Sequence, residues 1–324
     1  MKAIVYTKYG SPDVLQLKDV EQPIPNEEEV LVQVYAASAN PLDWHKMRAD
    51  PFITRLGNGL FKPKNTRPGA DIAGRVIAVG KNVTQFKPGD GVFGDICEVG
   101  SGGFAEYVAV PEHALVLKPS NLSFIESAAV PVAALTALQG LRHEGQIQAG
   151  QKVLVNGASG GVGTFAVQIA KAFGAEVTGV CSTQNLELVS SIGATHVIDY
   201  TKEDFTRTGV QYDLIYDAVG NRSVLDLARS LQPHGVCTVV GITNLFLAFQ
   251  VMWMGKWISR TSHKKIGMMM ASMNKEDLQF IKELVEAGKV APVIDRRYPL
   301  SQTADAIRYL ETGRARGKVV ITMV

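Results

Sequence analysis

Apolar and polar positions follow different patterns in the two parts of this chain. Up to about residue 120, short β-like apolar runs such as 29–34 and 73–79 are separated by Pro and Gly turns, which is typical of an all-β domain. From about residue 124, continuous apolar runs alternate with stretches of helical character. These runs occupy residues 153–155, 176–180, 195–198, 212–217 and 235–240. They predict a parallel sheet that helices cover on both faces.

The C-terminal part adds an amphipathic helical pattern at 275–287 and a last apolar run at 318–323. We expect this tail to return to the first domain. The 324 residues exceed what one hydrophobic core usually organises. The sequence therefore predicts an α/β protein of two domains. The first comprises residues 1–123, completed by about 265–324, and the second is a doubly wound domain of residues 124–264.

A glycine cluster follows the apolar run that begins at Val153 and precedes a helical pattern. In a strand–turn–helix of this kind, Gly160 is expected to adopt backbone angles closed to other residues, and Gly163 to let the helix pack closely on the strand. Phosphates then bind the free N–H groups at the start of the helix. The predicted dinucleotide loop comprises Ala158, Ser159, Gly160, Gly161, Val162 and Gly163, with Ala158 where a first glycine is usual.

The end of the second strand of this domain indicates which dinucleotide binds. An acidic residue about 20 positions after the loop usually holds the ribose of NAD, but Cys181 stands there. No carboxylate follows until Glu187, so a 2′-phosphate is not repelled. The small polar groups available to bind it are Ser182, Thr183 and Asn185. NADP(H) is therefore favoured over NAD(H), although the segment has no Lys or Arg and a cation must come from elsewhere.

Composition excludes some classes of function. The net charge of +2 and the absence of a long Lys/Arg run offer no footprint for nucleic acid. The three cysteines are far apart and no signal peptide is visible, which favours a reducing compartment, with the cytoplasm as the expected location.

Several further motifs resemble those of the medium-chain dehydrogenase/reductase superfamily over nearly the whole chain. They are Asn40–Asp43, Pro68–Gly74, Phe86–Gly94, Gly103–Tyr107 and Asp217–Gly220, together with the glycine loop. The resemblance implies a GroES-like β-barrel catalytic domain and a Rossmann domain that binds NADP(H). The most similar branch is that of quinone oxidoreductases and enone reductases, including chloroplast-envelope quinone oxidoreductase homologues. It implies hydride transfer to a quinone or to the C=C bond of an α,β-unsaturated carbonyl, in a homodimer.

The resemblance also bears on zinc. In zinc-binding members a Cys stands at the place of Asn40 and a His at the place of Ala70, and zinc needs such ligands in a tetrahedron. Asp43, His45 and Asp71 could hold a metal only in a new arrangement. We therefore expect no metal and a zinc-independent reaction.

The family pattern further implies site residues. Asn40 is placed beside the nicotinamide, where its amide can donate a hydrogen bond. His45 is either a proton donor or a structural histidine, and water could supply the proton instead. The remaining cofactor contacts implied are Thr136, Tyr200, Val219, Gly241, Ile242, Gly317 and Lys318. Asn185 replaces a Lys that serves the 2′-phosphate in many relatives, and Lys318 is a candidate for the missing cation.

Residues 245–258 are rich in large apolar and aromatic side chains, with Arg260, Lys264 and Lys265 after them. The segment is too short to span a bilayer. We favour a substrate-cleft wall or dimer surface, with peripheral membrane contact as the alternative. Two other functions stay open: a non-catalytic NADPH-binding sensor or structural protein, and a membrane-surface interaction protein.

Overall fold

The structure is a computed structural model that describes residues 1–52, 54–241, 243 and 245–323. Contacts divide the chain into two compact units. Unit 1 comprises Met1–Ala133, Ser272–Glu286 and Pro292–Val324, and unit 2 comprises Ala134–Ala271 and Ala287–Ala291. Residues 272–286 and 292–324 thus belong to the same unit as the N-terminal part, whereas 265–271 and 287–291 belong to unit 2.

Unit 1 is built mainly from strands. Its sheet has the order β14-β15-β3-β4-β5-β7, with β6 also paired to β3, and β1 and β2 form a separate pair. The strands are β1 (Lys2–Val5), β2 (Gln16–Asp19), β3 (Glu29–Ala39), β4 (Asp71–Val79), β5 (Gly91–Asp95), β6 (Tyr107–Pro111), β7 (Val116–Leu117), β14 (Ile294–Pro299) and β15 (Lys318–Thr322). The helices are α1 (Pro41–Arg48), α2 (Thr54–Asn58), α3 (Phe124–Ala128), α9 (Lys275–Glu286) and α10 (Thr303–Glu311).

Alternate residues of β3 explain why it lies in the middle of this sheet. Val30, Val32 and Val34 are buried in one hydrophobic cluster with Ile72 of β4 and Val92 of β5. Apolar side chains at every second position give a strand one face that must be covered. β3 is therefore a central strand of the sheet and pairs with β4, β6 and β15.

Residues 124–133 pack in unit 1, although the sequence pattern assigned them to the second domain. The helix α3 contacts β3 and β4, and its start is fixed by a capping box in which Ser123 and Glu126 exchange hydrogen bonds. The next helix, α4 (Pro131–Leu138), begins in unit 1 and continues in unit 2. The alternation of helix and strand begins at about residue 124. The chain enters unit 2 only at residue 134, because α3 still packs on strands of unit 1.

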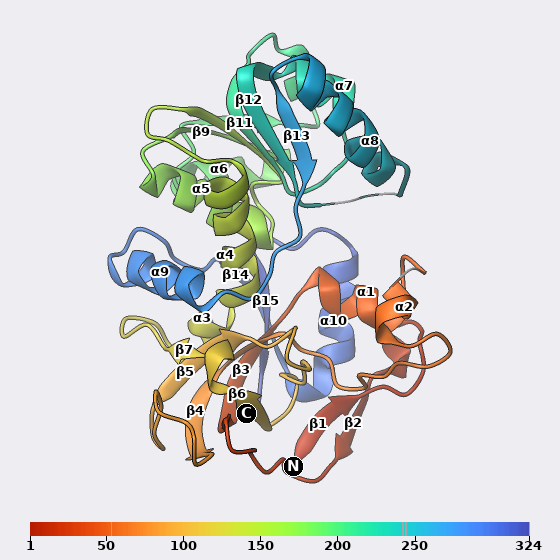
Figure 1. Ribbon diagram of the computed structural model, residues 1–324, viewed down its shortest axis with the longest axis vertical. Helices are drawn as coiled ribbons and strands as arrows, with labels where there is room; N and C mark the ends of the chain where they lie inside the picture. Colours follow the sequence, from red (N-terminus) through yellow and green to blue (C-terminus); the bar gives the residue numbers. More distant parts are fainter. Residues whose placement is uncertain (53, 242, 244, 324) are drawn as a thin grey trace. The chain divides into compact units, whose positions relative to one another are not determined.

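Unit 2 is a parallel six-stranded sheet of the order β10-β9-β8-β11-β12-β13. The strands are β8 (Lys152–Asn156), β9 (Glu176–Cys181), β10 (His196–Asp199), β11 (Tyr212–Asp217), β12 (Leu231–Val239) and β13 (Lys265–Met268). The helices are α5 (Gly161–Ala172), α6 (Leu186–Ser191), α7 (Val224–Arg229) and α8 (Leu245–Thr261). Figure 1 shows α5 and α6 on one face of this sheet and α7 and α8 on the other, which confirms the predicted doubly wound domain.

The strand order reverses between β8 and β11. At such a switch point the connections leave in opposite directions, so a crevice opens at the carboxyl ends of the two strands. The glycine cluster follows β8 and Asp217 ends β11. The topology thus brings both motifs to the edge of the sheet where α/β proteins bind ligands.

Candidate active site

The end of β3 carries a group of buried polar side chains in unit 1. Ser38 lies opposite Asp71 in the β3–β4 ladder, and Ala39 lies opposite Val319 in the β3–β15 ladder. These registers bring Asp71 and Lys318 beside Asn40, which follows β3. We call Ser38, Asn40, Asp71 and Lys318 the buried polar cluster, since each of them is at most 3% exposed.

Asp71 is the centre of the buried polar cluster. Its Oδ2 accepts from Ser38 Oγ at 2.5 Å and Asn40 Nδ2 at 2.8 Å, and its Oδ1 accepts from the backbone N–H of Val132 at 2.8 Å. The Lys318 ammonium lies 3.3 Å from Oδ2. A buried carboxylate is tolerated when it is paired and hydrogen-bonded in this way. From the sequence, Asp71 is expected only as a ligand of a metal in a new arrangement. A charged residue opening an apolar strand, as Asp71 and Lys318 both do, was the available signal.

The amide of Asn40 is fully engaged, which changes its predicted role. Its Nδ2 donates to Asp71 and to the Ser38 carbonyl at 3.2 Å, and its Oδ1 accepts from Lys318 Nζ at 2.5 Å. Because an amide nitrogen carries two hydrogens, none is left for a bound molecule. Direct donation from Asn40 to cofactor or substrate does not fit this geometry. Asn40 instead holds the Lys318 ammonium in place.

Lys318 also differs from its expected role as a cation for cofactor phosphates. Its ammonium is buried and bound to Asn40 and Asp71, so it is not the exposed cation expected for cofactor phosphates. Gly317 has a positive φ of 94°, and a Cβ there would lie 2.3 Å from the Val293 carbonyl oxygen. The turn before β15 therefore requires glycine at 317 for steric reasons.

Two further buried acids adjoin the cluster. Burial raises the pKa of Asp43 to about 6, although the N–H groups of Asn40 and Gly69 donate to its carboxylate and oppose this shift. Burial likewise raises the pKa of Asp95 to about 6, and the negative charge of Asp71 adds to the effect. Asp95 lies opposite Asp71 in the β4–β5 ladder. Unit 1 therefore holds two carboxyl groups that change charge near pH 6.

His45 lies on α1 with its ring stacked on Trp44, the ring centroids 3.6 Å apart. Its Nδ1 is 2.5 Å from the carbonyl oxygen of Asp50, an acceptor that requires a proton on Nδ1. A neutral imidazole with Nδ1 protonated has no proton on Nε2. His45 could thus donate a proton from Nε2 only as an imidazolium, and its contacts agree with the structural alternative.

In unit 2, the glycine turn joins β8 to α5. A Cβ on Gly163 would lie 2.0 Å from the Gly157 carbonyl oxygen, so close packing of helix on strand requires glycine there, as predicted. The prediction for Gly160 is wrong in one respect, because its φ of −82° is open to any residue. The positive φ occurs at Gly157, at 83°. Gly157 was missed because Ala158 was taken as the first position of the motif.

The start of α5 is suited to bind a phosphate group. Gly160 is the N-cap of α5, and the N–H of Thr164 is the first to bond back to its carbonyl. The N–H groups of Gly161, Val162 and Gly163 therefore precede the helical ladder. Ser159, Gly160, Gly161 and Val162 are only partly buried. These N–H donors at the partly buried start of α5 thus fit the pyrophosphate of a dinucleotide.

Val219 and Gly241 lie at the same edge of the sheet as the glycine turn. A Cβ on Gly157 would meet Val219 Cγ2 at 2.7 Å, and one on Gly241 would meet the Ala218 carbonyl oxygen at 2.2 Å. Asp217 fixes this arrangement, because its Oδ1 accepts from Asn156 Nδ2 and from the N–H groups of residues 219 and 220. Burial raises the pKa of Asp217. Ile242, also predicted here, lies outside the described residues.

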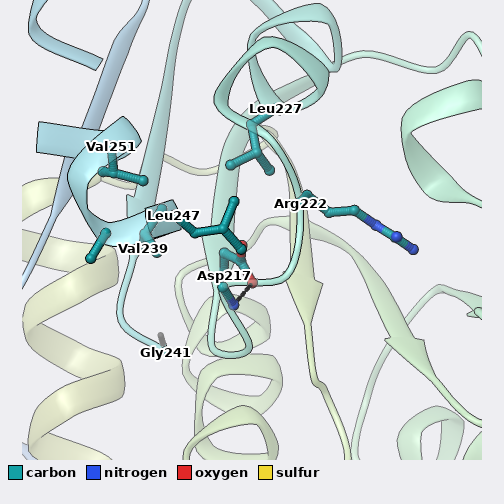
Figure 2. A pocket seen from close by; sticks show the side chains of 9 residues that line it. Asp217, Arg222, Leu227, Val239, Gly241, Leu247 and Val251 are labelled. Atoms are coloured by element: carbon teal, nitrogen blue, oxygen red, sulfur yellow. Dashed lines mark hydrogen bonds between the residues drawn. The ribbon is translucent and has the colours of Figure 1, made fainter. Parts of the chain in front are cut away.

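A small hollow adjoins Asp217, and Figure 2 shows the side chains around it. Its volume is about 10 Å³, roughly the room that one water molecule needs. Its walls are mostly apolar, and the Arg222 side chain points away from Asp217. The hollow is too small for a substrate.

The residues predicted to contact the cofactor ribose and its 2′-phosphate lie at and after the end of β9, and they differ in accessibility. Cys181 is 1% exposed, and burial raises the pKa of its thiol to about 11, so its side chain does not serve as a contact. Asn185 Nδ2 donates to Ser159 Oγ at 3.0 Å and to Ser182 Oγ at 3.1 Å. Because both serine oxygens act as acceptors here, their own hydroxyl hydrogens remain to donate to an anion.

A carboxylate and a cation reach this region from the next strand. Asp199 pairs with Cys181 across β9 and β10 and accepts from Thr183 Oγ1 at 2.6 Å, while Lys202 Nζ lies 3.7 Å from its Oδ2. The hydroxyl of Thr183 is therefore occupied. Tyr200 follows Asp199 and is 56% exposed. Sequence reasoning missed Asp199 and Lys202 because it followed only the segment after β9.

Two further expectations concern Thr136 and a bound metal ion. Thr136 is buried in α4, and its carbonyl accepts from Tyr216 Oη at 3.0 Å, which supports a packing role. Within the described residues, no group of three or more His, Cys, Asp or Glu side chains is arranged to hold a metal ion.

Comparisons with known proteins agree with this architecture. A family model for the alcohol dehydrogenase GroES-like domain matches residues 26–120, and one for zinc-binding dehydrogenases matches residues 192–321. A quinone oxidoreductase structure from Coxiella burnetii superimposes with a TM-score of 0.87 at 30% identity, covering 100% of this chain and 99% of that one.

Two curated plant proteins are more similar in sequence. The 2-methylene-furan-3-one reductase of Solanum lycopersicum is 41% identical, over 99% of this chain and 79% of the relative. The chloroplastic NADPH-dependent alkenal/one oxidoreductase of Arabidopsis thaliana is 37% identical, over the same shares. The chain belongs to the medium-chain dehydrogenase/reductase superfamily, in its branch of quinone oxidoreductases and enone reductases.

Proposed function

We propose that this protein is an NADPH-dependent reductase that transfers hydride to the C=C bond of an α,β-unsaturated carbonyl or to a quinone. The observation that carries the proposal is the turn from Gly157 to Gly163, whose packing demands glycine and whose N–H groups open α5. The names of the tomato and Arabidopsis relatives support the reaction class. NADPH supplies the hydride when it is bound.

The groups at the end of β9 support a preference for NADPH. Ser159 and Ser182 keep hydroxyl hydrogens for a 2′-phosphate because Asn185 orients both oxygens, and Lys202 offers an exposed cation. Asp199 carries the opposing charge, but hydroxyl groups and Lys202 surround it. Lys202 therefore takes the place of Lys318 as the proposed partner of the phosphate.

Lys318, within the buried polar cluster, is the proposed source of positive charge for the reaction. Negative charge develops on the carbonyl oxygen of the acceptor, and fixed charges in a dry site stabilise it strongly. Lys318 carries three N–H groups, of which two bind Asn40 and Asp71. We propose that its ammonium provides this electrostatic stabilisation, with Asn40 as its positioning residue. The proton comes from water or from the His45 imidazolium.

This proposal makes the reaction independent of zinc. Asn40 and Ala70 stand where zinc-binding relatives are expected to carry ligands, and Lys318 Nζ is hydrogen-bonded to Asn40 there. We also propose a homodimer, supported by the edge strand β13, which pairs only with β12 among the described residues. The cytoplasm remains our proposed location. No helix in the described part of the chain is long and apolar enough to cross a membrane.

The test is turnover of purified protein with short enones, exocyclic enones and quinones, followed by the loss of NADPH absorbance. We expect turnover with at least one acceptor class, at a rate that a zinc chelator leaves unchanged. Tight NADPH binding without turnover of any acceptor would instead support a non-catalytic sensor.

A further inference from the structure

The helix α8 exposes a continuous row of large apolar side chains. Phe246, Phe249, Met252, Trp253 and Trp257 are between 46% and 69% exposed. Spacings of three and four residues place them on one side of a helix. The opposite side carries Ala248, Val251 and Ile258, which are buried in unit 2. α8 packs on β13 and α7 through that side, at the edge of the sheet in Figure 1.

Two cations share this exposed side. Lys256 lies between Trp253 and Trp257, and Arg260 follows Trp257 by three residues. Both side chains are exposed. Neither has a hydrogen bond or an ion pair with any residue that the structure describes. We call the five apolar residues, with Lys256 and Arg260, the α8 outer face. Its aromatic side chains partly pack together, with Phe249 and Trp253 ring centroids 5.7 Å apart.

The surrounding sequence lacks acidic residues altogether. No Asp or Glu occurs from residue 227 to residue 275, although the whole chain has 31 acidic residues among 324. The same stretch contains several Lys and Arg residues. The charge of the α8 outer face is therefore not balanced from its own segment.

We propose that the α8 outer face docks on the surface of an anionic phospholipid bilayer. Tryptophan and phenylalanine are suited to the boundary between headgroups and acyl chains. Lys256 and Arg260 can keep their charges at the headgroups while their stems lie along the apolar boundary. The helix lies along the surface and does not cross it.

A second copy of the chain fits this face less well. In a two-fold interface the same patch meets itself, so Lys256 and Arg260 would meet a second α8 outer face, which carries no carboxylate. Cores of protein interfaces are depleted of such unpaired charges, and like charges oppose association. An anionic bilayer supplies the counter-charge that this segment lacks.

The first test is flotation of the full chain with vesicles of phosphatidylcholine alone or mixed with phosphatidylglycerol. We expect a partition coefficient about tenfold higher on the anionic vesicles, falling as salt is added. Lys256→Glu/Arg260→Glu should remove this gain. The exposed pair Lys289→Glu/Arg314→Glu changes net charge equally and should retain most of it. Equal loss in both variants would show attraction by net charge only and would overturn the proposal.

The second test uses phosphatidylcholine with brominated acyl chains in the anionic vesicles. Two of the three tryptophans of the chain lie on the α8 outer face, so their fluorescence should be quenched on binding. Trp253→Ser/Trp257→Ser should abolish flotation, and the exposed control Ile24→Ser/Val210→Ser should not. Circular dichroism checks that each variant is folded. A wild-type protein that neither floats nor is quenched contradicts the proposal, as does a Trp variant that only converts a dimer to a monomer in sedimentation velocity.

Discussion

At the scale of single residues, the pair of Lys318 and Asp71 carries the most specific chemistry in unit 1. Lys318→Met should leave the Asp71 carboxylate buried without its cation, which costs roughly 3–5 kcal/mol of unfolding free energy. Urea denaturation measures this loss. Lys318→Met/Asp71→Asn removes both charges and should regain much of the stability, while turnover should stay about tenfold or more below wild type. Recovery of turnover together with stability would reduce the pair to a structural role.

Ser182 tests the preference for NADPH. Ser182→Asp places a negative charge beside Asn185 and Ser159, where we propose that the 2′-phosphate binds. The Kd for NADPH should rise about tenfold or more, while that for NADH should change little or fall. Fluorescence titration with both cofactors measures this ratio. Cys181 is a poor choice for the same test because its side chain is buried. An unchanged ratio would mean that the phosphate binds elsewhere.

The raised pKa of Asp95 makes the free energy of unfolding depend on pH. Its pKa is about 6 in the folded protein and about 4 in the unfolded chain. The stability it contributes is therefore present below about pH 4 and lost as the pH rises through about 6, a change of about 3 kcal/mol. Asp95→Asn should remove this part of the pH dependence, measured by urea unfolding at about pH 4.5 and about pH 7.5. Parallel wild-type and variant profiles would contradict the predicted pKa.

At the scale of elements, the turn between β8 and α5 imposes a strict steric requirement for glycine at residue 163. Gly163→Ala should force the start of α5 away from β8 because its Cβ would meet the Gly157 carbonyl oxygen at 2.0 Å. We expect a loss of about 2 kcal/mol or more in stability and of measurable cofactor binding. Gly57→Ala, on α2 with nothing within 4 Å of the added Cβ, is the matched control. Normal NADPH binding by Gly163→Ala would refute the proposed role of this turn.

The elements themselves were largely predictable from the sequence. Periodicity placed β11 at Tyr212–Asp217, and it placed α9 and β15 within a residue of their observed ends. The site was less predictable, because it depends on pairing between distant strands. Lys318 reaches Asn40 across 278 positions, and Asp199 reaches the end of β9 from its neighbour β10. Local patterns contain no signal for either register, so the sequence analysis gave Asn40 and Lys318 separate roles.

At the scale of the whole molecule, the residues that support the proposed function are divided between the two units. Unit 2 provides the glycine turn, the oriented serines and Lys202, which together account for cofactor binding. Unit 1 provides the Lys318 ammonium and the acids near it. After the first passage from unit 1 to unit 2, the chain passes between the units three more times and ends in unit 1. We therefore expect substitutions of the buried polar cluster in unit 1 to lower turnover more than NADPH affinity. Substitutions at the glycine turn should lower NADPH affinity.

The most direct measurement is the transfer of deuterium to an α,β-unsaturated ketone from NADPH that carries deuterium at both hydrogen positions of the nicotinamide C4. We expect a saturated ketone heavier by one mass unit, with the deuterium on the carbon β to the carbonyl, and a much slower reaction for Lys318→Met/Asp71→Asn. Consumption of labelled NADPH without deuterium in the product would contradict direct hydride transfer. Tight binding with no product from any enone or quinone would contradict the assignment as a reductase.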